Sequence, residues 1–404
     1  MTITPDKPRT GRAASFVILI FLAIGALTVI WWYRPGNSEK RYESMSRVAL
    51  EQVLEREQNN KVAWKVFALR MAQDGAAGSA EPALIKAHQL NPADAALATG
   101  LGELWMSQGR IPEAFQVLKQ AALAHPNSVA PHRALGRLYM KRASYQHAMD
   151  ELALVVKLDP KADDAWYSMA ISSLQMQKAA DANSQIEKAL SLSQGNPQYM
   201  AVHGSILVAL GRVDEGITTR IEAAKRAPKD IKIQSGLVNL LLEQHRSDAD
   251  TTTAEEAIAR IEQVSTDYPL LPYQRGKVEM LRGHWDAAER YLRKAIESSP
   301  QQDEIYFALG QTERHLGNAA ASAQMMKMYE NRTAIHRKID QARASLADNP
   351  KDVTAYMKMA DSYMILGDRV SAISAIKSGL EIEPAHAVLK RWLQTLDTPQ
   401  PVRQ

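Results

Sequence analysis

Apolar and polar positions along most of the chain alternate with the period of an α-helix, in pairs of segments joined by short polar turns. The clearest pair spans residues 95–126. Gly102 and Trp105 lie on one face of its first helix, and Ala114 and Leu118 fall at i and i+4 on one face of its second. Because Gly102 and Ala114 are small, the two helices can approach closely. The pattern therefore predicts a helix–turn–helix unit.

Glycine and proline mark the limits of this unit. Gly109 falls where the chain must turn, and glycine tolerates the positive φ that such turns need. Pro126 closes the unit, because proline cannot continue a helix interior and suits the first turn of the next helix. The remaining chain carries the same signals at regular intervals.

Prolines recur at intervals of 34 residues, at Pro92, Pro126, Pro160 and Pro228, with Gln194 at the one place where proline is missing. Small residues at the eighth, twentieth and twenty-seventh places, a large apolar residue at the eleventh and proline at the thirty-second resemble the tetratricopeptide repeat. The resemblance implies an all-α fold, an α-solenoid of about nine helix–turn–helix units over residues 61–386.

Three places depart from the 34-residue period. The sixth unit holds about seven extra residues, which we place in a longer turn over the polar run 246–253. Pro269 and Pro272 shorten the first helix of the seventh unit. In the eighth, the apolar pattern continues and predicts one long helix over residues 319–347. An amphipathic capping helix over 387–396 and a tail over 397–404 follow.

The N-terminal region has a different character. Residues 1–14 form a basic tail, and no charged residue occurs from Ala13 to Tyr33. We predict a transmembrane helix over residues 15–33, ending in an aromatic cluster where a membrane interface would lie. A cleaved signal peptide is the alternative, but the apolar run continues past the small residues at which cleavage would occur. Residues 34–60 are assigned to a linker and an N-terminal capping helix, with helical pattern over Ser38–Glu57.

Basic residues flank this anchor on both sides in nearly balanced numbers, with Arg34, Lys40, Arg41 and Arg47 after it. Lys7, Arg9 and Arg12 precede the apolar segment, and a short basic tail before a first segment usually stays in the cytoplasm. We therefore expect a single-pass protein of the bacterial inner membrane with its repeats in the periplasm.

Composition narrows the function classes. The absence of cysteine excludes disulfides, thiolate catalysis and thiolate metal sites. A net charge of +4 over 404 residues gives little reason to expect nucleic acid. The ten histidines are scattered without metal-ligand spacing, and no phosphate-binding or nucleophile motif occurs. We therefore predict no catalytic residue, no metal site, no cofactor and no small-molecule substrate, and the chain is not expected to be an enzyme.

The resemblance implies that a concave groove is lined by the second, fifth, ninth, twelfth and thirteenth places of each unit. In the third unit these include Arg133, Arg137 and Lys141, spaced to point the same way along one helix. Such a stripe could bind an acidic peptide or a terminal carboxylate. The alternative is an ordinary solvated face, with Glu103 offsetting part of the charge.

Methionine and aromatic side chains occupy other groove places. Methionine suits grooves that bind varied apolar side chains but equally fills cores, and aromatic residues are enriched in binding hot spots. These further candidates are Met106, Met140, Met280 and Met364 at twelfth places, and Tyr167, Tyr273 and Phe307 at fifth places. No unit combines lysine at the fifth place with asparagine at the ninth, the pair with which some tetratricopeptide proteins bind a chaperone tail; the first unit has Lys65 but Leu69.

The sequence thus predicts a non-enzymatic, membrane-anchored scaffold that binds partner proteins in its groove, for envelope assembly, secretion or polysaccharide export. Two alternatives stay open. The chain could be an accessory subunit of a membrane glycosyltransferase or synthase, or of cytochrome c maturation. It could also be a structural protein that self-associates through Met325–Leu346 of the long helix.

Overall fold

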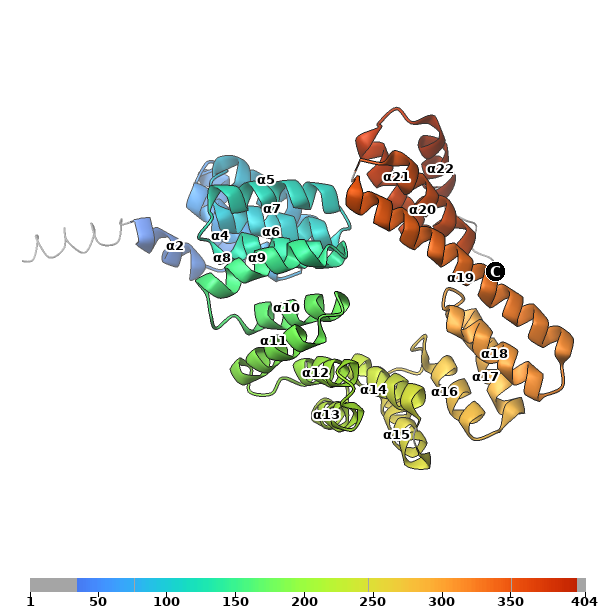
Figure 1. Ribbon diagram of the computed structural model, residues 1–404. Helices are drawn as coiled ribbons and strands as arrows, with labels where there is room; N and C mark the ends of the chain where they lie inside the picture. Colours follow the sequence, from blue (N-terminus) through green and yellow to red (C-terminus); the bar gives the residue numbers. More distant parts are fainter. Residues whose placement is uncertain (1–34, 76, 246, 350, 398–404) are drawn as a thin grey trace, which may run out of the picture. The chain divides into compact units, whose positions relative to one another are not determined.

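The computed structural model describes residues 35–397 apart from 76, 246 and 350, and every regular element in them is a helix (Figure 1). The predicted membrane segment over 15–33 and the basic tail before it lie outside the described residues. Among the helices that are described, none combines the length and the apolar character that crossing a membrane requires.

The chain divides into two compact parts, an N-terminal module ending at Tyr199 and a C-terminal module beginning at Met200. Helix α12 begins just before the boundary and is described with the C-terminal module, to which most of it belongs. Each module is a row of antiparallel helix pairs, and the nine pairs agree with the predicted all-α repeat. In the N-terminal module the pairs are α4 (Lys61–Gln73) with α5 (Ala77–Leu90), α6 (Ala95–Ser107) with α7 (Ile111–Ala124), α8 (Val129–Lys141) with α9 (Tyr145–Leu158), and α10 (Asp163–Gln175) with α11 (Ala179–Leu192).

The C-terminal module continues the series with less regular lengths. Its pairs are α12 (Pro197–Ala209) with α13 (Val213–Arg226), α14 (Ile231–Gln244) with α15 (Asp248–Val264), α16 (Leu271–Leu281) with α17 (Trp285–Ser298), α18 (Asp303–His315) with α19 (Ala319–Asp348), and α20 (Val353–Leu366) with α21 (Arg369–Ile382), followed by α22 (Ala387–Asp397). With 11 residues, α16 is short, as Pro269 and Pro272 predict. With 30 residues, α19 covers the stretch where the sequence predicts one long helix.

The glycine at the eighth place sets how closely the helices of a pair approach. A Cβ built on Gly102 would lie 2.5 Å from Cγ of Leu118, and one on Gly136 would lie 2.8 Å from Cγ of Leu152. Both leucines are buried. In these pairs the leucine of the second helix fills the space that glycine leaves, which explains the small residue that recurs in the sequence.

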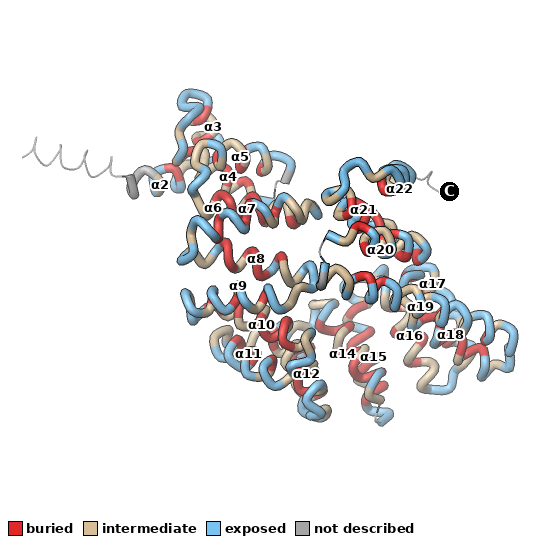
Figure 2. The backbone as a smooth tube through the Cα atoms, turned by 45° about the horizontal axis from the view of Figure 1, so that its top comes forward, coloured by how far each residue is buried: buried red, intermediate tan, exposed pale blue. Residues whose placement is uncertain are grey.

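Successive pairs stack in a consistent way. Within each module, a second helix packs against the first helix of the next pair, as α7 does against α8 and α17 against α18. The first helices also contact one another directly, α6 with α8 and α14 with α16. Buried positions accordingly concentrate where helices face each other, with exposed positions on the outer sides (Figure 2). The places assigned to a groove therefore lie on adjacent helices within each module.

The prediction of a long turn over 246–253 is wrong, because α15 already begins at Asp248. Three of the extra residues instead lengthen the second helix of this pair, which has 17 residues where α5, α7 and α9 have 14. The side chains of Thr252 and Thr253 donate back to the carbonyl oxygens of Asp248 and Ala249, at 3.1 and 2.9 Å. Asp248 and Asp250 lie in the first helical turn, where the helix dipole favours negative charge.

The predicted single helix over Ser38–Glu57 is in fact two helices, α2 (Pro35–Glu43) and α3 (Arg47–Arg56). A contact from the first repeat holds the break: Arg70 donates to the carbonyl oxygens of Glu43 and Met45, at 2.6 and 2.5 Å. Ser46 then caps α3 by accepting from the backbone N–H of Ala49. Leu50 of α3 is buried against α4, so this segment covers the first repeat.

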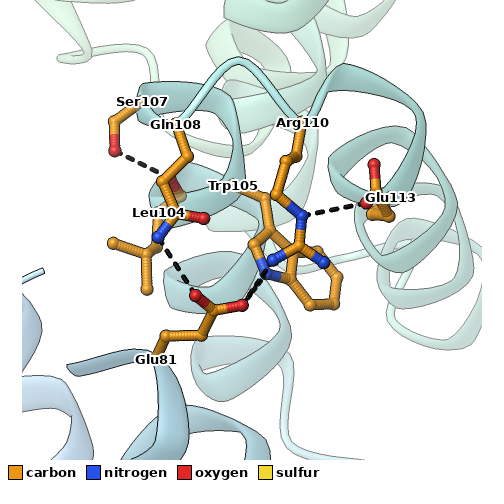
Figure 3. Close-up of polar contacts among 7 residues, drawn as sticks. All are labelled: Glu81, Leu104, Trp105, Ser107, Gln108, Arg110 and Glu113. Atoms are coloured by element: carbon orange, nitrogen blue, oxygen red, sulfur yellow. Dashed lines mark hydrogen bonds and ion pairs between the residues drawn. The ribbon is translucent and has the colours of Figure 1, made fainter. Parts of the chain in front are cut away.

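Glu81 of α5 links the first repeat to the second (Figure 3). Its carboxylate accepts from Nε1 of Trp105 at 2.9 Å, from Nε2 of Gln108 at 3.1 Å and from the guanidinium of Arg110. The guanidinium also lies over the Trp105 ring, 4.9 Å from its centroid. The hydrogen bond from Trp105, then those from Gln108 and Arg110, hold the pKa of Glu81 below its ordinary value.

We expect Glu81→Gln to weaken this link and to lower the free energy of unfolding by about 1 kcal/mol at neutral pH. Because the folded-state pKa is depressed, the carboxylate's contribution is present above its ordinary pKa of 4.5 and is lost as the pH falls through the folded-state value. Urea unfolding of wild type and variant from pH 7 to 3 measures this, and the two curves should converge in acid. A constant gap across the range would contradict the assignment.

Candidate partner-binding surface

The three cations of α8 that the sequence proposes as a basic stripe each contact a neighbouring unit. Arg137 forms an ion pair with Glu103 of α6, and Nζ of Lys141 donates to the carbonyl oxygen of Met106 at 2.9 Å. Arg133 reaches in the other direction, with Nε 3.3 Å from a carboxylate oxygen of Asp164 in α10. These side chains therefore tie three consecutive first helices together and carry much of their counter-charge within the chain.

Lys65, another basic groove residue, is also paired. Its Nζ lies 2.9 Å from Glu39 of α2 and 3.0 Å from Asp94, the residue that caps α6. Burial lowers the pKa of Lys65, but the hydrogen bonds to both carboxylates outweigh it and the pKa is raised. Basic groove residues of the N-terminal module thus serve to join α2, α4, α6, α8 and α10.

Methionines at the twelfth places are mostly packed. Met106 is 9% exposed and belongs to the core around α6. Met140 and Met280 are half-buried and pack against the cores of their modules. Met364 of α20 is half-buried. Their sulfur atoms therefore contribute chiefly to packing between helices.

The aromatic candidates differ in how far they reach solvent. Tyr167 stacks on Tyr199 with ring centroids 4.4 Å apart. Tyr273 of α16 is half-buried, and burial raises its pKa to about 12. Phe307 of α18 is 37% exposed and lies 5.1 Å from the Tyr329 ring of α19. Of the three aromatic candidates, Phe307 is the one that presents a large exposed apolar surface at a groove place.

A charged group in the C-terminal module was missed by sequence reasoning. Lys277 occupies the ninth place of its unit and Glu243 the thirteenth. Both places are ones that the resemblance assigns to the groove. Arg220 lies on α13, a second helix, to which this assignment does not apply. Its guanidinium nevertheless passes to the first helices and donates to Oγ of Ser205 in α12 at 2.5 Å. Glu243 interacts electrostatically with both cations.

No metal-binding arrangement accompanies this surface. Within the part of the chain that the structure describes, no three or more histidine, aspartate and glutamate side chains converge as metal ligands would.

Comparison with known proteins agrees with the geometry. Models of the tetratricopeptide repeat match residues 71–134, 106–171 and 273–333. A tetratricopeptide repeat protein from Parabacteroides merdae ATCC 43184 is 20% identical, with a TM-score of 0.50 over 65% of this chain and 98% of that one. This likeness shows the fold. No curated protein matches the chain.

Two further solved structures resemble parts of the chain less closely. One is a thermophilic tetratricopeptide repeat protein from Thermus thermophilus, 18% identical over 43% of this chain and 97% of that one, with a TM-score of 0.39. The other is PilW, a type IV pilus biogenesis factor, 20% identical over 50% of this chain and 91% of that one, with a TM-score of 0.44.

Proposed function

Because the chain contains tetratricopeptide repeats, which generally mediate protein–protein interactions, we propose that it is a non-enzymatic scaffold that binds a segment of a partner protein along its first helices. The observation that carries this proposal is the direct stacking of first helices, α6 on α8 and α14 on α16. Stacking turns separate groove places into a continuous strip of polar and aromatic side chains, on which an extended or helical segment can lie.

The proposal includes a membrane anchor. It is supported by the uncharged run from Ala13 to Tyr33 and the basic residues before it. An anchor would raise the local concentration of the scaffold beside membrane partners, as envelope assembly, secretion or polysaccharide export require. Retention of the full chain in carbonate-washed membranes tests the anchor, and a reporter fused after Gln404 tests whether the repeats reach the periplasm.

Site-specific photocrosslinking in cells tests partner binding. Phe307 of α18 and Tyr291 of α17 are nearly equally exposed, 37% and 38%, but only Phe307 lies on a first helix. We expect a benzoylphenylalanine at position 307 to form a defined crosslinked product with a partner identified by mass spectrometry. The same group at position 291 is the matched control and should give at least about fivefold less product, since a hot spot is confined to the contacted face.

Equal crosslinking from both positions, or crosslinking from position 291 alone, would contradict binding along the first helices. A product of twice the mass of the chain at position 307 would instead favour the self-association alternative.

A further inference from the structure

Arg220 is an incompletely neutralised cation in the C-terminal module. Its Nη2 donates to Oγ of Ser205, and its Nε is buried without a hydrogen-bond partner. In the described chain, no carboxylate lies within ion-pair distance of this guanidinium. Burial lowers the pKa of Arg220, against a smaller raising effect of Glu243. Burying a charge in this way is costly unless an anion compensates it.

Glycines make room for this side chain on two helices. A Cβ on Gly236 of α14 would lie 2.6 Å from Nη1 of Arg220, and one on Gly204 of α12 would lie 2.6 Å from its Cγ. Each glycine costs a helix interior about 1 kcal/mol relative to alanine. Arg220 thus crosses from the second helix α13 toward the first helices through a gap that alanine at either position would close.

Lys277 of α16 interacts electrostatically with the same carboxylate. Burial lowers its pKa, with Glu243 opposing, and no hydrogen bond or ion pair within 4 Å is found for its ammonium group in the described residues. Burial, then Glu304 and Glu243, raise the pKa of Tyr273, one turn before Lys277. Glu243 is exposed. Glu243 therefore acts on both of these partly buried cations, and in the described residues neither cation has a carboxylate at ion-pair distance.

The contrast with the N-terminal module is direct. There Lys65 and Arg137 each have a carboxylate at contact distance, and Arg133 has one at 3.3 Å. Cations with short-range partners must give them up before they can bind an external anion. Arg220 and Lys277 have no such partner to give up, so an incoming carboxylate gains more from them.

We propose that Arg220 and Lys277 bind acidic side chains of the partner segment, with Ser205 and the Tyr273 hydroxyl as additional polar contacts. This rests on the proposed scaffold function and names the chemistry of its ligand. The two cations select the occupant: with no carboxylate at ion-pair distance in the described residues, both attract a negatively charged segment, and a guanidinium accommodates carboxylates bidentately.

A fluorescein-labelled peptide of ten glutamates with an amidated C-terminus provides a direct test. Its fluorescence anisotropy is measured with the full-length chain in non-ionic detergent at low salt. We expect saturable binding, loss of about tenfold in affinity for Lys277→Gln and a larger loss for Lys277→Gln combined with Arg220→Gln. Glu243→Gln removes the competing carboxylate and should strengthen binding about threefold or more. Raising the salt should weaken all of these.

Arg275→Gln is the matched control, because it removes a cation of the same helix α16 that is already paired with Glu262 at 2.7 Å, and it should change affinity less than twofold. Lys277→Gln removes a cation without an ion-pair partner in the described residues and keeps the test valid if Arg220→Gln disturbs folding, which circular dichroism detects. Three results would overturn the proposal: no binding to wild type, equal losses for Arg275→Gln and Lys277→Gln, or a requirement for a free C-terminal carboxylate. If crosslinking from position 307 persists while peptide binding fails, the acidic-ligand assignment is wrong and the scaffold function stands.

Discussion

Gly204→Ala is expected to lower the local free energy of unfolding of α12 and α13 by about 2 kcal/mol. A Cβ on Gly204 would lie 2.7 Å from the backbone oxygen of Gly216 and 2.6 Å from Cγ of Arg220. A Cβ on Gly216 would likewise lie 2.7 Å from the backbone oxygen of Gly204. Because one obstacle is backbone, no rotamer change relieves the contact and the helices must separate. The helix preference of alanine, about 1 kcal/mol, offsets only part of this cost.

Hydrogen exchange of the α12 and α13 amides measures the effect where it occurs, which is needed because repeat arrays can unfold in parts. Gly78→Ala in α5 is the control, since a Cβ there meets nothing within 4 Å. It should stabilise its helix by up to about 1 kcal/mol. If both substitutions stabilise, α12 and α13 are not held in contact through their glycines.

Ala334→Pro should have the larger effect, about 3 kcal/mol or more, at the middle of α19. Proline removes one helical hydrogen bond and clashes with the preceding turn. Ala334 is itself exposed, so the substitution disturbs the backbone and not a core. The helix packs against both α18 and α20, and so joins two repeats through continuous backbone. Breaking it should uncouple them.

Limited proteolysis and hydrogen exchange are the measurements for this variant. We expect cleavage near position 334 and loss of protection in the surrounding turns, while α20 and α21 keep theirs. Ala334→Gly is the matched control and should cost only about 1 kcal/mol. If proline and glycine have the same effect, the continuity of α19 does not hold the two repeats together.

Local sequence signals were sufficient for the repeat itself. Helix pairs, their turns and their 34-residue period follow from residues near one another, such as Gly102, Gly109 and Leu118. The two errors lie where the local pattern does not show burial or a distant contact. Thr251 is buried within α15, and the break between α2 and α3 is held by Arg70 from the first repeat. A polar run and an amphipathic run do not reveal such contacts.

For the candidate surface too, the sequence predicts one part and only the structure shows the other. Periodicity places Arg133, Arg137 and Lys141 on one face, but their partners lie about one repeat away, as Glu103 does from Arg137. Only the stacked structure shows which cation meets a carboxylate.

By itself, then, the sequence determined an all-α chain of 34-residue helix–turn–helix repeats and an apolar segment before them, because both depend on short-range periodicity. The tertiary structure alone decided which charges are compensated. Arg220 belongs to a second helix and reaches the first helices because Gly204 and Gly236, 16 residues on either side of it in sequence, leave room for its side chain. Neutralisation of a buried charge depends on distances across such packed helices, and no local pattern in the sequence encodes them.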